Sequence, residues 1–229
     1  EDVIGGSFGF HDHWKIPHVS HPKGDSKEGN DRLYAEWEAG RGPDPTTTGL
    51  TAEEQKLFLA LTPNMMEMFT RYHMDYHVQP SFYQAPHHNL IGMHVDEAVY
   101  APMYFGYGGP GEYADRAAMA PHMEERILEM APDAVNILVM ASPDVIRKRM
   151  KESSHENGIV QEKDVEQVLQ RFQEEYDRSL LKNKFTIDTS TASVEESLAD
   201  FIEKIEPFLT DADLTRILVQ RAKKAGDWV

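Results

Sequence analysis

Apolar positions along the chain follow two periods, which predict strands alternating with helices after an irregular beginning. The first 49 residues are dense in Gly, Pro and Thr, so residues 1–49 are predicted to be irregular, with one short strand at 16–20. Further strands are predicted where short apolar runs end in small or polar residues, at 90–95, 134–142 and 184–190. The run at 134–142 has almost no polar alternation, which is typical of a parallel strand covered on both faces.

Helices are predicted between and after these strands. Thr51 and Asn64 are expected to cap the first two, and the segment 114–132 is expected to be helical with a break or new start at Pro121. One helix begins at Pro143, and residues 162–182 carry the clearest apolar stripe. Ser193 and Glu196 have capping-box spacing, and a last short helix is expected at 211–225.

Strands that alternate with helices indicate right-handed β-α-β units. The sequence therefore predicts an α/β fold, a three-layer sandwich with a central, mostly parallel sheet, in a single domain over residues 1–229. The carboxyl ends of parallel strands meet at one edge of a sheet, and ligands bind in the crevice there. Polar residues follow three predicted strands, at Asp96, at Ser142, and at Asp188, Thr189 and Ser190. These ends are expected to share one edge.

Composition excludes several classes of function. The 23 Lys and Arg residues against 39 Asp and Glu give a net charge of −16, which repels nucleic acid polymers. A small phosphorylated ligand is compatible with this negative net charge, because a few local arginines can hold it. The chain has no cysteine and no apolar run near the roughly 20 residues that span a bilayer, so no membrane partner is expected. A cytoplasmic location is the default expectation.

Five segments, in order from about residue 16 to 208, resemble the thymidylate kinase family of the P-loop nucleoside and nucleotide kinases. APDAVNILVMASPDVIRKRM at 131–150 is similar to the family's strand and helix before its lid, and FTIDTSTASVEES at 185–197 to its loop under the adenine. VDEAVYAP at 95–102 resembles its Asp-Arg-Tyr-Val-x-Ser element. FTRYH at 69–73 and VSHPKGD at 19–25 resemble its phosphate-binding helix and its Arg-Glu-Pro-Gly-Gly turn more weakly.

The chain departs from the family in two places. The loop Gly-x-x-x-x-Gly-Lys-Ser/Thr, whose backbone N–H groups and lysine hold phosphates, is not found in these 229 residues. Glu97 stands where the family usually has arginine. A carboxylate there would disfavour a phosphorylated acceptor and favour a neutral one, although a purely structural role is the alternative.

The resemblance assigns roles to residues around the expected cleft. Arg149 matches the arginine that packs on adenine, and Arg147, Arg149 and Lys151 would neutralise charge on the transferred phosphoryl group. The segment 152–164 resembles the lid. Asp96 would orient a substrate hydroxyl or hold Mg²⁺ through water. The remaining candidates are Arg71, Glu97, Tyr100, Tyr104 and Tyr107 for the acceptor, and Asp188, Thr189 and Ser190 for ATP. The alternatives are purely structural roles. Asp96 would cap a turn, the tyrosines would pack in the core, and the cations would lie on a solvated helix face.

Histidines raise a separate hypothesis, because nine of the eleven precede residue 95, in clusters. His11 and His13, or His73 and His77, have plausible spacing for Zn²⁺ or Fe²⁺. No complete signature such as His-Glu-x-x-His is present, so no metal ligand is predicted.

The sequence thus predicts a nucleoside monophosphate kinase-like phosphotransferase, which would use Mg²⁺ and ATP and act on a nucleotide or a related small acceptor. The alternative is a kinase-like protein that has lost transfer chemistry and serves binding or assembly. A histidine-based metal enzyme is the third hypothesis. Relatives with the expected fold often pair through helices, so a homodimer is a further expectation.

Overall fold

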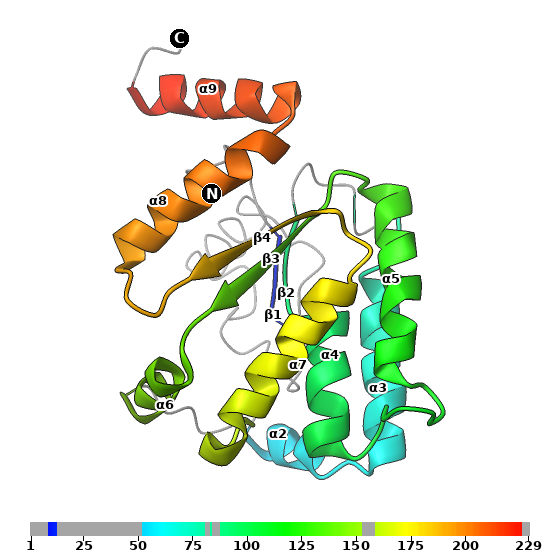
Figure 1. The fold of residues 1–229 in the computed structure, drawn as a ribbon. Helices are drawn as coiled ribbons and strands as arrows, with labels where there is room; N and C mark the ends of the chain where they lie inside the picture. The colour runs from blue at the N-terminus through cyan, green and yellow to red at the C-terminus, as the bar shows by residue number, and fades with distance from the viewer. Residues whose placement is uncertain (1–8, 13–51, 81–82, 84–87, 153–158, 226–229) are drawn as a thin grey trace, which may run out of the picture. The chain divides into compact units, whose positions relative to one another are not determined.

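The computed structural model describes residues 9–12, 52–80, 83, 88–152 and 159–225 (Figure 1). They fall into two compact units, one comprising Glu1–Met93 and Thr210–Val229 and the other His94–Leu209. A single cooperative unfolding transition would test the prediction that the chain behaves as one domain.

In the described residues of the first unit, a small parallel strand pair is combined with three helices. Strands β1 (Gly9–Asp12) and β2 (His88–Ile91) pair in parallel, with Gly9 opposite His88. The helices are α2 (Ala52–Leu59), α3 (Pro63–Tyr76) and α9 (Asp211–Ala225). The bounds of α9 confirm the helix predicted at 211–225. The methionine-rich α3 buries Met66 and Met74, so part of its methionine content serves the core.

The second unit contains the longer strands. Its elements, in order, are α4 (His94–Tyr100), the π-helix η3 (Ala101–Phe105), α5 (Arg116–Met130), β3 (Val135–Met140), α6 (Pro143–Glu152), the 3₁₀ turn η4 (Glu162–Asp164), α7 (Val165–Arg178), β4 (Asn183–Asp188), α8 (Val194–Ile205) and the 3₁₀ turn η5 (Glu206–Phe208). The predicted capping box of α8 is confirmed, since Ser193 Oγ accepts from Glu196 N–H and Glu196 Oε2 accepts from Ser193 N–H.

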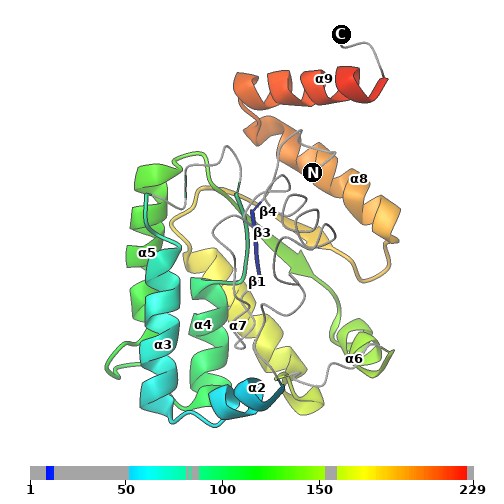
Figure 2. The ribbon, with the colours of Figure 1, turned by 180° about the vertical axis from the view of Figure 1, so that it is seen from behind.

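Strands β3 and β4 pair in parallel, with Val135 opposite Asn183 and Met140 opposite Asp188. Helix α7 packs along β3, α8 packs along β4, and α4 packs between α5 and α7. Figures 1 and 2 show α7 and α8 on opposite sides of the strand pair. The core of this unit includes Val99 of α4, Ile127 of α5, Val165 and Val168 of α7, and Ile187 of β4.

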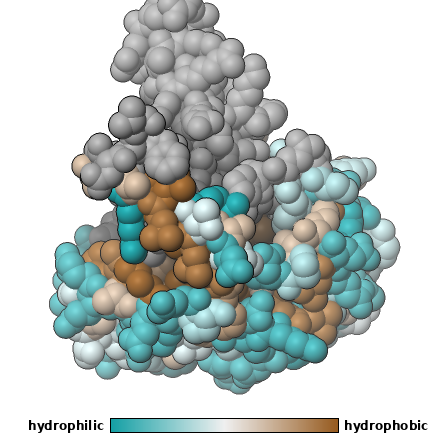
Figure 3. Space-filling view, turned by 90° about the horizontal axis from the view of Figure 1, so that it is seen from above, coloured by the Kyte–Doolittle hydropathy of each residue, from teal (hydrophilic) through white to brown (hydrophobic). Residues whose placement is uncertain are grey.

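The predicted three-layer sandwich around a central sheet is wrong. The described residues are mostly helical, and their strands form two separate two-stranded parallel sheets. In a sandwich, the apolar strand β3 would be covered on both faces, yet Val139 is 61 % exposed. Val194 of α8 is also exposed, at 81 %. On the face drawn in Figure 3, hydrophobic residues gather in patches between hydrophilic ones.

The stretch around Asp96 explains part of this error. The predicted strand 90–95 is replaced by β2, which ends at Ile91, and by α4, which begins at His94. Gly92 (φ 82°) and Met93 (φ 54°) turn the chain between the two in the left-handed region. Asp96 therefore lies in the first turn of a helix, so the prediction that it ends a strand is wrong.

Two helix boundaries also differ from the prediction. Helix α5 runs through Pro121 without a break, and Asp115 caps it by accepting a hydrogen bond from Ala118 N–H. Pro121 is the sixth residue of this helix and has no N–H to donate to the Ala117 carbonyl, so the helix continues with one backbone hydrogen bond fewer. Helix α3 takes Thr62 as its N-cap in place of Asn64, with Pro63 in the first turn.

Among the described residues, every helix is too short or too polar to cross a membrane.

Candidate functional site

The two longer strands end side by side, and their polar ends form the tightest cluster of predicted site residues. The Thr189 N–H and its Oγ1 both donate to Met140 O, at 2.8 and 2.9 Å. The Ser142 N–H donates to Ser190 Oγ at 2.8 Å. The predicted meeting of the ends at Ser142 and at 188–190 is therefore confirmed. We name the set Ser142, Arg149, Asp188, Thr189 and Ser190 the strand-end cluster.

Arg149 reaches this cluster from α6. Its Nη1 donates to Thr189 Oγ1 at 2.9 Å, and its Nη2 donates to Thr189 O at 2.7 Å. Both bonds lie at the exposed surface. Two hydrogen bonds to one residue fix the plane of a guanidinium group, and a fixed guanidinium plane can stack on an aromatic ring. Arg149 thus offers a flat guanidinium face at this cluster.

Asp188 places a negative charge beside that surface. Its Oδ1 accepts from the Ser190 hydroxyl at 2.5 Å and from the Ser190 N–H at 2.8 Å. These two hydrogen bonds lower the pKa of Asp188, because they favour the ionised carboxylate. Asp188 is therefore an ionised acceptor at neutral pH, one residue before the Thr189 that binds Arg149.

Helix α6 separates the three cations that the resemblance grouped together. Arg149 contacts the end of β4, whereas Arg147 forms an ion pair with Glu166 of α7 and Lys151 Nζ lies 2.8 Å from Glu162 Oε1. Residues two positions apart on a helix point about 200° apart, which accounts for the division. The hydrogen bond with Glu166 raises the pKa of Arg147. Arg147 and Lys151 thus face α7, away from the strand-end cluster.

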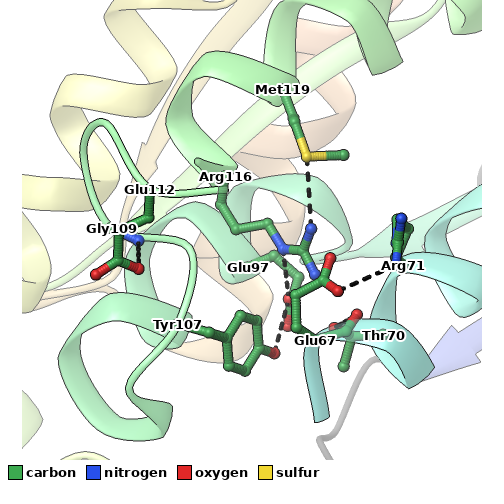
Figure 4. Close-up of polar contacts among 9 residues, drawn as sticks. All are labelled: Glu67, Thr70, Arg71, Glu97, Tyr107, Gly109, Glu112, Arg116 and Met119. Atoms are coloured by element: carbon green, nitrogen blue, oxygen red, sulfur yellow. Dashed lines mark hydrogen bonds and ion pairs between the residues drawn. The ribbon is translucent and has the colours of Figure 1, made fainter. Parts of the chain in front are cut away.

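Glu97 lies in a buried network, shown in Figure 4. Its Oε2 accepts from Arg116 Nε at 3.1 Å and from the Tyr107 hydroxyl at 3.0 Å. Arg116 is 1 % exposed, and its Nη1 also contacts Met119 Sδ at 3.5 Å. The loop before α5 allows this arrangement, because a Cβ added at Gly108 (φ +72°) would lie 2.6 Å from Arg116 Cγ.

This network joins α4, the chain after η3, and α5. Glu97 is only 7 % exposed, so its carboxylate faces a neighbouring cation in the core. The geometry agrees with the structural role that the sequence left open for Glu97. Tyr107 is 5 % exposed and belongs to the same network. Sequence reasoning missed Arg116, although an acid within a buried apolar run requires a cationic partner.

The other two tyrosines contact α7 and its start. The ring of Tyr100 meets that of Phe172 edge to face, with centroids 5.4 Å apart. The Tyr104 hydroxyl donates to Asp164 Oδ2 at 3.2 Å. Burial is the largest cause that raises the pKa of both phenols, and the Asp164 carboxylate adds to it for Tyr104. These contacts correspond to the packing alternative, while stacking on an acceptor stays a prediction.

Asp96 and Arg71 are not part of the strand-end cluster. Asp96 lies near Tyr100 on α4, and its charge adds to the raised pKa of that phenol. Arg71 belongs to the first unit, on α3, where its Nη2 lies 3.2 Å from Glu67 Oε2 (Figure 4). Their proposed roles toward an acceptor stay predictions.

Sequence reasoning also missed a second buried polar residue, Glu124. Glu124 of α5, only 2 % exposed, accepts from Ser179 Oγ at 2.7 Å and from Leu180 N–H at 2.6 Å. Its Oε1 also lies 3.1 Å from His94 Nε2. Burial acts to raise the pKa of Glu124, but the three hydrogen bonds outweigh it and hold the pKa below its ordinary value.

Four of the nine histidines that precede residue 95, at 13, 18, 21 and 87, lie outside the described residues. At the C-cap of α3, His77 is fully buried and its Nδ1 lies 2.7 Å from His73 O. In the part of the chain that the structure describes, no three His, Asp or Glu side chains are placed to hold a metal ion. Residues 153–158 of the predicted lid and the predicted strand at 16–20 also lie outside the described residues.

Comparison with known proteins gave no match to any family model, curated protein or solved structure.

Proposed function

We propose that this protein binds an adenine nucleotide at the strand-end cluster and acts as a nucleoside monophosphate kinase-like phosphotransferase. The observation that carries the proposal is the pair of hydrogen bonds by which Thr189 holds the Arg149 guanidinium at the joined ends of β3 and β4. The resemblance to thymidylate kinases assigns Arg149 to the adenine. The two segments with the best match, 131–150 and 185–197, are the ones that these bonds connect.

The chemistry of the cluster suits a purine base. A guanidinium held flat can stack on an aromatic ring and attract its π-electrons. The ionised Asp188 accepts hydrogen bonds, and the exocyclic amino group of adenine donates them. Mg²⁺ and ATP would then be the cofactor and the donor. Transfer would require a loop that holds the phosphates, which these 229 residues do not contain.

One observation favours binding without transfer as a second candidate function. Arg147 and Lys151 are paired with Glu166 of α7 and Glu162 of η4, on another side of α6 from Arg149. Both cations are thus already engaged with carboxylates of this chain. Measuring ATP consumption with nucleoside monophosphates and Mg²⁺ separates the two functions, because both predict nucleotide binding and only the first predicts ADP formation.

Replacing Arg149 by alanine is expected to weaken ADP binding about tenfold, since it removes a stacking and cation-π contact worth about 1–2 kcal/mol. Isothermal titration of ADP into the wild-type protein and the Arg149→Ala variant measures this change. The matched control is Lys148→Ala, which removes an exposed cation from the same helix and should leave ADP affinity unchanged. Equal ADP affinity in the wild-type and Arg149→Ala proteins would contradict the proposal.

A further inference from the structure

Helix α6, which carries Arg149, combines a half-buried apolar side with charged contacts. Val145, Ile146 and Met150 are half-buried, and none of the ten residues is fully buried. Figures 1 and 2 show α6 beside the start of α7. A ten-residue helix is marginal by itself and is held by its tertiary contacts. The partners of its long charged side chains therefore add to the apolar contacts in setting its position.

Those partners lie on two sides of α6. On one side Arg149 is bound to Thr189. On the other side Arg147 pairs with Glu166 and Lys151 pairs with Glu162. We call the latter two contacts the α6 ion pairs. The two cations are four residues apart on α6, and the two acids are four residues apart across η4 and the start of α7, so the spacings match.

The start of α7 is itself attached to the rest of the second unit. Tyr104 donates to Asp164, which lies between the two acids in sequence. Val165 and Val168 are buried, and Arg171 Nη2 donates to Ala98 O of α4 at 2.9 Å. Glu162 and Glu166 therefore extend from an anchored segment toward α6, which has no fully buried residue.

We infer that Glu162 and Glu166 are positioning residues for nucleotide binding: through the α6 ion pairs they hold α6 so that Arg149 reaches Thr189. The inference rests on the proposed function, because it concerns the same site. It assigns a role to two acids that no motif singled out. It also accounts for Arg147 and Lys151, which face α7 although the resemblance placed them at the donor.

The inference predicts a salt-sensitive site. Exposed ion pairs weaken as salt screens their charges. Loss of both pairs should let α6 move, and Arg149 would then spend less time on Thr189. Replacing both acids in Glu162→Gln/Glu166→Gln is expected to lower ADP affinity about fivefold at low salt and to change it less at high salt.

The test combines ADP titration with amide hydrogen exchange of the nucleotide-free protein. In Glu162→Gln/Glu166→Gln, residues 143–152 should exchange several times faster than in wild type, while α5 and α8 should be unaffected. Glu203→Gln serves as the matched control, because it removes an exposed carboxylate from α8 and should alter neither measurement. The charge-reversed pair Arg147→Glu/Glu166→Arg should restore most of the exchange protection and ADP affinity that Arg147→Glu alone loses.

Three results would overturn the inference. They are wild-type ADP affinity in the double variant, weaker ADP binding with unchanged exchange in α6, and stronger ADP binding, which would mean that the acids compete with the phosphates. Failure of the proposed function gives a different result, because the wild-type protein would then bind no ADP at either salt concentration.

Discussion

Replacing Arg116 by methionine is expected to lower the free energy of unfolding by about 3–5 kcal/mol, because it removes the cation beside a buried carboxylate. Arg116 is 1 % exposed and its Nε lies 3.1 Å from Glu97 Oε2. Methionine fills a similar volume, so the loss reports charge and hydrogen bonding more than packing. Chemical denaturation monitored by circular dichroism measures the change.

The double variant Arg116→Met/Glu97→Met removes the whole ion pair, so it tests whether Arg116→Met loses stability because Glu97 is left buried without its cation. Replacing both charges by apolar groups of similar size is expected to recover most of the stability that Arg116→Met loses. Lys148→Met is the control, since it removes an exposed cation and should change stability by less than about 0.5 kcal/mol. Stability of Arg116→Met equal to that of Lys148→Met would contradict the network described around Glu97.

Replacing Glu124 by alanine is expected to cost about 3 kcal/mol at neutral pH, because Ser179, Leu180 and His94 lose a common buried partner. The sign of its pH dependence follows from its lowered pKa. A carboxyl with a folded-state pKa below its unfolded value of about 4.3 stabilises the fold above that value. This stabilisation is lost as the pH falls through the folded-state pKa.

The stability difference between wild type and Glu124→Ala should therefore be largest near neutral pH and shrink below about pH 4. Denaturation midpoints at a series of pH values measure it. Glu125→Ala is the control, because its neighbouring carboxylate is exposed and should produce little change. A difference that stays constant down to strongly acidic pH would show that Glu124 does not act through its charge.

Local signals in the sequence predicted the local structure of the second unit well. The apolar run that became β3, the capping box at Ser193 and the helix after Pro143 follow from short-range rules, and the structure confirms each of them. The juxtaposition of Ser142 with Ser190 was also predictable, because parallel strands place their ends at one edge.

The errors arose where tertiary context decides. The residues after Ile91 fit a strand as well as a helix, and the left-handed turn at Gly92 and Met93 selected the helix. The extent of a sheet depends on which strands meet, and the sequence pattern alone does not contain that information. Sequence reasoning missed Arg116 and Glu124 because their partners are distant in the sequence. Glu97 is 19 residues from Arg116, and the partners of Glu124 are at least 30 residues from it.

The central claim is that Arg149 and Thr189 form the surface on which an adenine base stacks. Photo-crosslinking with an azido-adenine nucleotide, followed by mass spectrometry of the peptides, locates the base directly. Labelling that ADP competes away should fall on residues 143–152 and 185–193, and should be lost in Arg149→Ala. Competed labelling confined to other peptides, or none at all, would contradict the account.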